Sequence, residues 1–375
     1  MTKDADDGMT YADTGVNYDD MDPFKRKCLS AAIETVGNIE RLGFRALLES
    51  YGESVFLIEP TDDVPFMSAD VNEGLGTKNL VADAMYRLTG KSYYDQIAQD
   101  TVAMIVNDMI TLGALPLSVK MHLDLSKSNW VNDEKRTRDL VEGWKNACNM
   151  SRCVWSGGET ATLKDMMEPR TAILSGSAMG CVKPKERLIA TSNLQGGDAI
   201  VLVASSGIHA NSLSMARQIA DKLPEGYLTK LDDGRTYGEA LLDPTIIYVP
   251  LVEECLNAGI PIHYTVNITG HGWRKLMRAP QPFTYVLEKI PEPQPVFRSI
   301  QEHGPVSFEE MYGNLNMGAG FVFYVPDNEV QRVIELAKTL GMSASHAGHI
   351  ETSKEKKVVI QPLNLEYCGE TLRVR

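Results

Sequence analysis

The chain has 375 residues, 43% of them apolar, so it is long enough to bury a full hydrophobic core and to form two domains. Its formal net charge of −13 argues against a partner such as nucleic acid, because binding to a phosphate backbone depends on lysine and arginine. No apolar stretch approaches the roughly 20 residues that cross a bilayer, and no targeting pattern is visible, so we expect a cytoplasmic protein with no membrane partner.

The six cysteines are scattered along the chain, and only Cys148 and Cys153 are close in sequence. Their spacing fits no zinc-binding pattern. We therefore expect free thiols that are buried or half-buried.

The N-terminal part of the chain begins with an acidic segment, residues 1–25, which we expect to form a flexible arm. A helix is predicted over 24–42. Residues 54–69 alternate strand-forming residues with turn residues, which indicates strands that lead to a glycine-rich loop at Glu73.

Two helices are predicted after that loop. In the first, apolar residues recur at helical spacing and Gly90 provides the stop. The second covers 94–112 and places Asn107 and Asp108 on one face. Because the neighbours of Asp108 are apolar, we expect its carboxylate to project from a rigid element rather than to be a plain surface charge.

The segment 183–197, rich in proline, glycine and polar residues, is the predicted linker between domains. A buried strand is predicted over 198–204, followed by a polar turn over 205–212 and then a helix. A strand, a glycine-containing turn and a helix in this order direct backbone N–H groups at an anion.

The C-terminal part is predicted to contain a strand over 320–325, a helix over 330–340 with Asp327 as its N-cap, and a strand over 358–363. Mixed helices and strands without a long repeat indicate an α+β fold with two domains. We place the N-terminal domain at 26–185 and the C-terminal domain at 186–375.

Three short polar stretches each put a carboxylate beside glycine, amide or hydroxyl groups: Glu73-Gly-Leu-Gly-Thr-Lys78, Val106-Asn-Asp108 and Gly157-Gly-Glu-Thr160. Their carboxylates, on Glu73, Asp108 and Glu159, are hard oxygen ligands, and Lys78 can balance the charge of a phosphate. Magnesium takes one or two carboxylates together with phosphate oxygens. The three stretches together therefore predict a magnesium–nucleotide site.

The motifs, in their order along the chain, resemble those of the aminoimidazole ribonucleotide synthetase family, whose superfamily includes selenophosphate synthetase and thiamine-phosphate kinase. Beside the three stretches above, the landmarks are Tyr11-Ala-Asp-Thr-Gly-Val16, Gly113-Ala-Leu-Pro116, Ser205-Ser-Gly-Ile-His-Ala-Asn211, Leu241-Leu-Asp-Pro-Thr245, Ile268-Thr-Gly-His-Gly272 and Glu310-Met-Tyr-Gly-Asn-Leu-Asn-Met-Gly-Ala-Gly320.

The resemblance implies a cyclo-ligase of purine biosynthesis. ATP would phosphorylate the formyl-amide oxygen of formylglycinamidine ribonucleotide, and ring closure to aminoimidazole ribonucleotide would release ADP and phosphate. It implies ATP and Mg²⁺ as cofactors and a phosphorylated ribonucleotide as the small-molecule substrate. It also implies a homodimer in which the N-terminal mixed sheets form an inter-subunit barrel and each C-terminal α/β sandwich packs outside it.

The resemblance also suggests roles for individual residues. Catalytic roles fall on His209 and Asn211, and on Lys27 through a looser match to the family's N-terminal lysine. The residues expected to bind the nucleotide are Glu73, Gly74, Gly76, Thr77, Lys78, Asn107, Asp108, Gly157, Gly158, Glu159 and Thr160, with Glu73, Asp108 and Glu159 as metal ligands. The alternatives are ordinary loop carboxylates, a histidine hydrogen-bonded at a strand end, and a solvated basic turn at Lys27.

The chain departs from the family pattern at five positions near the expected site. Glu73 stands where aspartate is usual, Asn267 where histidine is usual, His271 and Ser212 where glycine is common, and Gly313 where arginine is usual. These departures leave two alternatives open. One is a divergent paralogue that activates a different amide or small acid with ATP, and the other is a non-catalytic, nucleotide-binding dimer.

Overall fold

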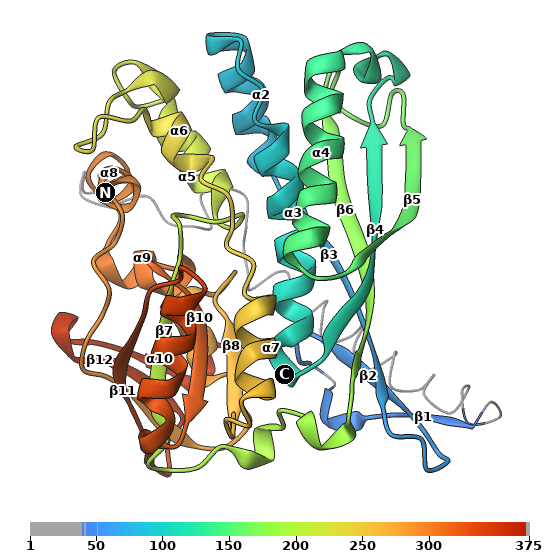
Figure 1. The fold of residues 1–375 in the computed structure, drawn as a ribbon. Coiled ribbons are helices and arrows are strands. Elements are labelled where there is room, and N and C mark those ends of the chain that lie inside the picture. The colour runs from blue at the N-terminus through green and yellow to red at the C-terminus, as the bar shows by residue number, and fades with distance from the viewer. Residues whose placement is uncertain (1–39, 41–42, 51, 373–375) are drawn as a thin grey trace.

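The computed structural model describes residues 40, 43–50 and 52–372 of the chain. The predicted arm over 1–25 and the predicted catalytic residue Lys27 lie outside the described residues, as does nearly all of the predicted helix over 24–42. Two β-sheets form the frame of the described part, each with helices packed against it (Figure 1).

The N-terminal sheet has six strands in the order β1-β2-β3-β6-β4-β5. Only β4 and β5 run parallel, so the sheet is mixed. The strands are β1 (Phe44–Ala46), β2 (Phe56–Pro60), β3 (Met67–Gly74), β4 (Leu115–Leu125), β5 (Val154–Thr162) and β6 (Ala172–Val182).

Three helices cover one face of this sheet: α2 (Lys78–Thr89), α3 (Tyr94–Met109) and α4 (Glu134–Met150). Helix α3 lies directly on β6, because a Cβ on Gly176 would come within 2.8 Å of the Ile105 side chain. The residues of β6 alternate between buried and less buried positions. Ile173 and Met179 therefore point away from α3, toward the opposite face of the sheet.

The C-terminal sheet has seven strands in the order β13-β12-β9-β11-β7-β10-β8, and only β12 and β9 run parallel. The strands are β7 (Ala199–Ala204), β8 (Tyr264–Asn267), β9 (Phe283–Leu287), β10 (Ala319–Val325), β11 (Ala344–Thr352), β12 (Lys357–Ile360) and β13 (Leu365–Cys368). The helices of this half are α5 (Leu213–Ala220), α6 (Tyr237–Leu241), α7 (Val249–Asn257), α8 (Pro295–His303), α9 (Phe308–Asn314) and α10 (Val330–Thr339).

The two halves meet where the end of α3 lies beside β8, the edge strand of the C-terminal sheet (Figure 1). Just after α3, a short 3-10 turn (Ile110–Leu112) contacts this strand. The Thr265 hydroxyl donates a hydrogen bond to the Thr111 carbonyl at 2.9 Å. One helix of the first half therefore touches both sheets.

Several predicted elements are confirmed, and three assignments are wrong in detail. The helix over 94–112 and the strands over 198–204 and 320–325 are present as α3 with its 3-10 turn, β7 and β10. Asp327 is not the N-cap of the last helix, because it begins a separate 3-10 turn (Asp327–Glu329). The strand predicted over 358–363 ends at Ile360, since Pro362 lies in a following 3-10 turn and has no N–H to donate.

The third correction concerns two of the polar stretches. Glu73 and Glu159 are not loop residues, because Glu73 lies in β3 and Glu159 in β5. Within the described part of the chain, no helix is both long enough and apolar enough to cross a lipid bilayer.

Candidate active site

The seam between the two halves is held by side chains of α3 that bind the backbone of residues 245–248. The Asn107 Nδ2 group donates to the Ile246 carbonyl at 2.8 Å, and its Oδ1 atom accepts from the Tyr248 N–H at 2.9 Å. About two helical turns before Asn107, the Gln99 amide donates to the Thr245 carbonyl at 2.9 Å. The Asn107 side chain therefore holds the 245–248 segment against α3.

A fully buried ion pair lies at the same seam. The Lys78 ammonium, at the start of α2, is 2.9 Å from Oδ1 and 2.8 Å from Oδ2 of Asp100 on α3. It also donates to the Asp243 carbonyl at 2.7 Å. Asp100 in turn accepts a hydrogen bond from the Thr245 N–H at 2.8 Å.

Burial dominates the electrostatics of this pair. It lowers the pKa of Lys78 and raises the pKa of Asp100, and the contact between the two charges opposes both shifts. Both side chains are 0% exposed. In this structure the Lys78 ammonium binds protein acceptors, so its predicted place beside a phosphate stays a prediction.

A second polar contact crosses the seam next to the end of α3. The Asn267 Nδ2 group, on β8, donates to Asp108 Oδ1 at 2.6 Å, and both side chains are buried. The carbonyl of Asn267 accepts from the Lys275 ammonium at 3.2 Å, and the same ammonium contacts the Thr269 hydroxyl. Asp108 therefore has an amide partner from the other half of the chain, and the backbone carbonyl of that partner binds a lysine.

Sequence reasoning missed Asp100 and Lys275, although signals for both were present. Asp100 precedes Asn107 by seven residues on the same helix, a spacing that returns to the same face. Lys275 lies in a 3-10 helix (Gly272–Met277) directly after the Ile268–Gly272 motif.

The turn over 205–212 contains His209, which is buried with a left-handed backbone at φ +60°. Its Nε2 atom accepts a hydrogen bond from the Ser206 N–H at 3.3 Å, so the proton of the neutral ring is assigned to Nδ1. Burial, followed by the charge of Lys78, lowers the pKa of His209 to about 3. His209 is therefore a neutral hydrogen-bonding group at neutral pH and not a cationic acid.

The same turn lies against both α3 and the loop that precedes α2. The Asn211 amide is 3.7 Å from the Met104 sulfur of α3. Gly76 has a left-handed backbone at φ +76°, and a Cβ placed on it would lie 3.9 Å from the Ala210 carbonyl oxygen. The structure thus brings the Glu73–Lys78 stretch, the end of α3 and the His209 turn together.

The loop residues before α2 have polar groups that face the region near the His209 turn. Thr77 is the N-cap residue of α2, and its half-buried side chain makes no capping hydrogen bond. Gly76 is exposed and Gly74, at the end of β3, is exposed as well. A helix N-terminus with accessible backbone N–H groups is a favourable place for a phosphate.

The Gly157–Thr160 stretch lies elsewhere on the sheet. Glu159 is exposed on β5, and its Oε1 atom accepts from the Thr160 N–H at 3.1 Å. A Cβ on Gly158 would lie 1.9 Å from the Met121 carbonyl oxygen, so glycine is required there for β5 to approach β4. Gly157, at φ +98°, has open space around it.

The three predicted metal ligands do not converge within one chain. In the order β3-β6-β4-β5, the strand of Glu159 is three places from that of Glu73, which corresponds to roughly 14 Å at the usual strand spacing. Among the described residues, no group of three or more His, Cys, Asp or Glu side chains is arranged to hold a metal ion. The three carboxylates therefore do not fit a single ion in this chain.

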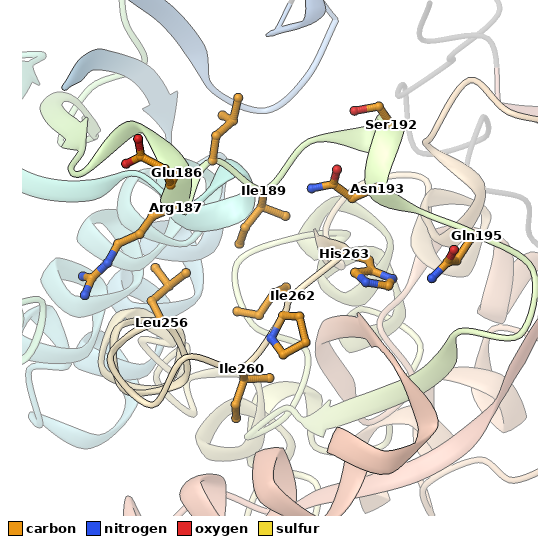
Figure 2. A pocket seen from close by; sticks show the side chains of 12 residues that line it. Glu186, Arg187, Ile189, Ser192, Asn193, Gln195, Leu256, Ile260, Ile262 and His263 are labelled. Atoms are coloured by element: carbon orange, nitrogen blue, oxygen red, sulfur yellow. The ribbon is translucent and has the colours of Figure 1, made fainter. Parts of the chain in front are cut away.

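A cavity of about 520 Å³ lies apart from these motifs, between the linker and the turn after α7 (Figure 2). Arg187 and Asn193 line it from the linker side, and Ile260 and His263 from the other side. The His263 Nδ1 atom is 2.8 Å from Asp198 Oδ1. None of the predicted site residues lines this cavity.

Comparison with known proteins gives a consistent assignment over both halves. The family model "AIR synthase related protein, N-terminal domain" matches residues 72–182, and "AIR synthase related protein, C-terminal domain" matches residues 195–361. The chain is 36% identical to a phosphoribosylformylglycinamidine cyclo-ligase of Methanocaldococcus jannaschii over 285 residues, which cover 76% of this chain and 78% of the relative. It is 31% identical to the enzyme of that name from Methanothermobacter thermautotrophicus, over 98% of this chain and 100% of the relative.

Solved structures share the fold at low sequence identity. A HypE–HypF complex matches with a TM-score of 0.56 and 16% identity, covering 80% of this chain and 89% of that chain. The structure named AaThiL complexed with AMPPCP and TMP matches with a TM-score of 0.55 and 14% identity, covering 82% of this chain and 87% of that chain.

Proposed function

The chain belongs to the AIR synthase-related family, and we propose that it is a phosphoribosylformylglycinamidine cyclo-ligase, an ATP-dependent ligase of purine biosynthesis. The resemblance and the α+β fold class stated from the sequence are both confirmed by the family matches and the fold neighbours. The relative from Methanothermobacter thermautotrophicus that carries this name covers 98% of the chain. The domain limits at 26–185 and 186–375 stay part of the proposal.

The proposed reaction requires an oxygen to leave an amide carbon. ATP transfers its γ-phosphoryl group to the formyl-amide oxygen of formylglycinamidine ribonucleotide, which converts a poor leaving group into phosphate. A nitrogen of the same substrate then attacks that carbon and closes the imidazole ring, and phosphate departs beside ADP. The protein contributes mainly by placing the two substrates in line and by stabilising charge on the transferred group.

One observation supports placing the reaction at this seam. The stretch Glu73–Lys78 of the first half faces the His209 turn of the second half, because Gly76 lies close to Ala210. A phosphate at the start of α2 would therefore lie near the His209 turn. We assign the accessible backbone at Gly76 and Thr77 to the nucleotide phosphates.

His209 is proposed to contact the reacting amide or its phosphorylated oxygen through a neutral imidazole. Because its pKa is about 3, the ring acts by hydrogen bonding, with Nδ1–H as donor, and not by delivering a proton from an imidazolium ion. Asn211 lies two residues further along the same turn and is assigned to the substrate as well. Lys27 keeps its proposed catalytic role, which lies outside the described residues.

Asp108 and its partner Asn267 are proposed to orient the substrates at the end of α3. The buried Asp108 carboxylate is fixed by the 2.6 Å hydrogen bond from Asn267, so it is preorganised for a ligand. Lys275, bound to the Asn267 carbonyl, brings positive charge close to this pair. Such local charge is needed because the chain as a whole carries a net charge of −13 while its substrates are anionic.

Mg²⁺ belongs to the proposal as the ion that neutralises the triphosphate. Since the predicted trio does not fit one ion within a chain, one or two carboxylates would hold it together with phosphate oxygens. Asp108 and Glu73 are the candidates, while Glu159 and Thr160 on β5 are too far away to join them in the same chain.

The test is phosphate release from ATP in the presence and absence of formylglycinamidine ribonucleotide, with the imidazole product measured in parallel. We expect substrate-dependent release in equal amounts of phosphate and product. Asp108→Ala and His209→Ala should each lose most of this activity, whereas Glu335→Ala, an exposed carboxylate on α10, should keep it. Phosphate release without ring closure would contradict the proposed function.

A further inference from the structure

The C-terminal end of α4 forms a hydrogen-bonding pattern that brings two cysteines together. After the last helical residue, Met150, and the cap Ser151, Arg152 adopts a left-handed backbone at φ +55°. The Cys153 N–H donates to the Cys148 carbonyl at 3.0 Å, and the Arg152 N–H donates to the Asn149 carbonyl at 3.0 Å. These two bonds around a left-handed residue define a Schellman motif.

In a Schellman motif the two residues joined by the longer hydrogen bond often make an apolar side-chain contact. Here those two residues are Cys148 and Cys153, so the motif places their side chains next to each other. A disulfide requires Cα atoms roughly 4.4–6.8 Å apart. The backbone bond between the same two residues holds them in close approach, so the pair needs little movement to become a disulfide.

The two thiols differ in accessibility and in acidity. Cys148 is only 3% exposed, whereas Cys153 is half-buried. The interaction with the neighbouring Cys148 thiol lowers the pKa of Cys153, and the same interaction together with burial raises the pKa of Cys148. Because the thiolate is the nucleophile, Cys153 is the thiol that reacts first.

The pair lies on the helix side of the N-terminal sheet. Trp155, two residues after Cys153, packs against Trp144 of α4 with ring centroids 6.1 Å apart. Side chains two residues apart on an extended chain share a face. The cysteines are therefore on the face opposite to the exposed Ile173, and a second subunit on that other face would leave them reachable.

We propose that Cys148 and Cys153 are a redox-active pair that closes into an intramolecular disulfide on reaction with a low-molecular-weight disulfide. The Cys153 thiolate attacks one sulfur of the small disulfide, expels a small thiolate and becomes a mixed disulfide. The Cys148 thiol then loses its proton and attacks the Cys153 sulfur, and the second small thiol leaves. Two protein thiols are oxidised, and the small disulfide is reduced to two thiols.

The test uses glutathione disulfide as the oxidant on the full chain, followed by blocking of free thiols and digestion with trypsin. Cleavage after Lys145 and Arg152 places the two cysteines on separate peptides, 146–152 and 153–164. A closed pair therefore appears as these two peptides linked by a bond that a reductant breaks. We expect this linked species to be the main product of oxidation at these positions.

Two variants separate the steps. Cys148→Ser should stop at a stable glutathione adduct on Cys153, because the second thiol is missing. Cys255→Ser, which removes a fully buried thiol in α7, should give the same linked peptide as the wild type. A wild-type chain whose two peptides remain separate, either both blocked or with a lasting adduct on Cys153, would overturn the proposal.

Discussion

Ser212 and His271 hold left-handed backbone conformations, at φ +62° and +68°. A side chain in this region costs roughly 1–2 kcal/mol relative to the usual backbone, while glycine is free of that cost. Glycine would avoid this cost at both positions. The presence of serine and histidine there is therefore expected to lower stability as well as to change the chemistry of the site.

Ser212 gives a clean test of this backbone cost. The Ser212 hydroxyl donates to the Asn314 carbonyl at 2.9 Å, so both Ser212→Gly and Ser212→Ala lose that bond. Only the alanine variant keeps a Cβ at φ +62°, and we expect it to be less stable than the glycine variant by about 1 kcal/mol. Denaturant unfolding of the two variants measures the difference, and equal stabilities would contradict the assigned conformation.

His209 predicts a pH dependence of stability with a definite sign. Its pKa is about 3 in the folded protein against 6.5 for the unperturbed group. Between these values the unfolded chain binds a proton that the folded chain does not, so stability falls as the pH drops from 6.5 toward 3. Above that window the group is neutral in both states and contributes no pH dependence.

The matched variant is His209→Asn, because asparagine tolerates the left-handed backbone and does not titrate. The unfolding free energy of the wild type should fall relative to this variant by about 1.4 kcal/mol per pH unit inside the window. Unfolding curves collected at several pH values test this, and parallel curves for the two proteins would show that His209 titrates normally. In activity, His209 should introduce no pKa between pH 5 and 8.

Helix α3 is the element that joins the two halves. Its side chains Gln99, Asp100, Asn107 and Asp108 all bind groups of the C-terminal half, in the 243–248 segment or on β8. Thr245, the last residue of the Leu241–Thr245 motif that sequence reasoning assigned only by resemblance, therefore has a physical role, because it binds both Gln99 and Asp100 of α3. Residues far apart in sequence share this seam, which explains why spacing alone could not reveal it.

The Lys78–Asp100 pair within this seam should be worth far more than a surface pair. Removing one partner leaves a buried charge uncompensated, so Lys78→Met is expected to cost about 3–5 kcal/mol of unfolding free energy. The double variant with Asp100→Asn should cost less than the sum of the two single variants. Lys357→Met, which breaks a surface pair with Glu366, is the control and should leave the unfolding free energy nearly unchanged.

The same set of variants also distinguishes between two roles for Lys78. Unchanged stability of Lys78→Met together with a loss of nucleotide affinity would contradict the buried pairing and favour the phosphate contact that the sequence predicts. A loss of unfolding free energy in the predicted range, together with a double-variant cost below the sum of the two single variants, would show that Lys78 acts in the seam.

The two central strands with continuous apolar runs were predictable, and an edge strand without such a pattern was not. Strands β7 and β10 are almost continuously buried and were located to within a residue. Strand β5 is an edge strand whose side chains are mostly exposed, so its sequence lacks the alternation that marks a strand. The sequence prediction does not include α4, although its buried residues Leu140, Trp144 and Ala147 recur at helical spacing.

The candidate site shows the same division. The sequence motifs identify the Glu73–Lys78 stretch, Asp108 and the His209 turn, and the structure brings these together. Glu159 lies apart from them because of the strand order of the sheet, which no local sequence pattern contains. The burial of Lys78 also follows from Asp100 and Asp243, partners that are 22 and 165 residues away in sequence.

The molecule as a whole has a sheet face that no helix of the described chain covers. Ile173 and Met179 on β6 are 47% and 44% exposed there, beside the polar outward residues of β3. A homodimer that pairs these faces, as the family resemblance implies, would bury them. We keep the homodimer as a proposal that rests on this face.

The double variant Ile173→Asp/Met179→Asp should convert a wild-type dimer into a monomer, because it places charges in the middle of the proposed interface. Light scattering after size-exclusion chromatography measures the mass. The control is Val141→Asp, which changes an equally exposed residue (46%) on α4, and it should remain dimeric. A wild-type monomer, or a double variant that stays dimeric, would rule out this interface.

The most direct test of the proposed cyclo-ligase is the fate of the formyl-amide oxygen. Formylglycinamidine ribonucleotide labelled with heavy oxygen at that position is turned over with ATP, and the released phosphate is examined by mass spectrometry. If ATP phosphorylates this oxygen, the label leaves the substrate and appears in the phosphate, one labelled phosphate for each imidazole ring formed. Unlabelled phosphate, or no ring formation despite bound ATP, would contradict the reaction proposed for the seam between the two halves.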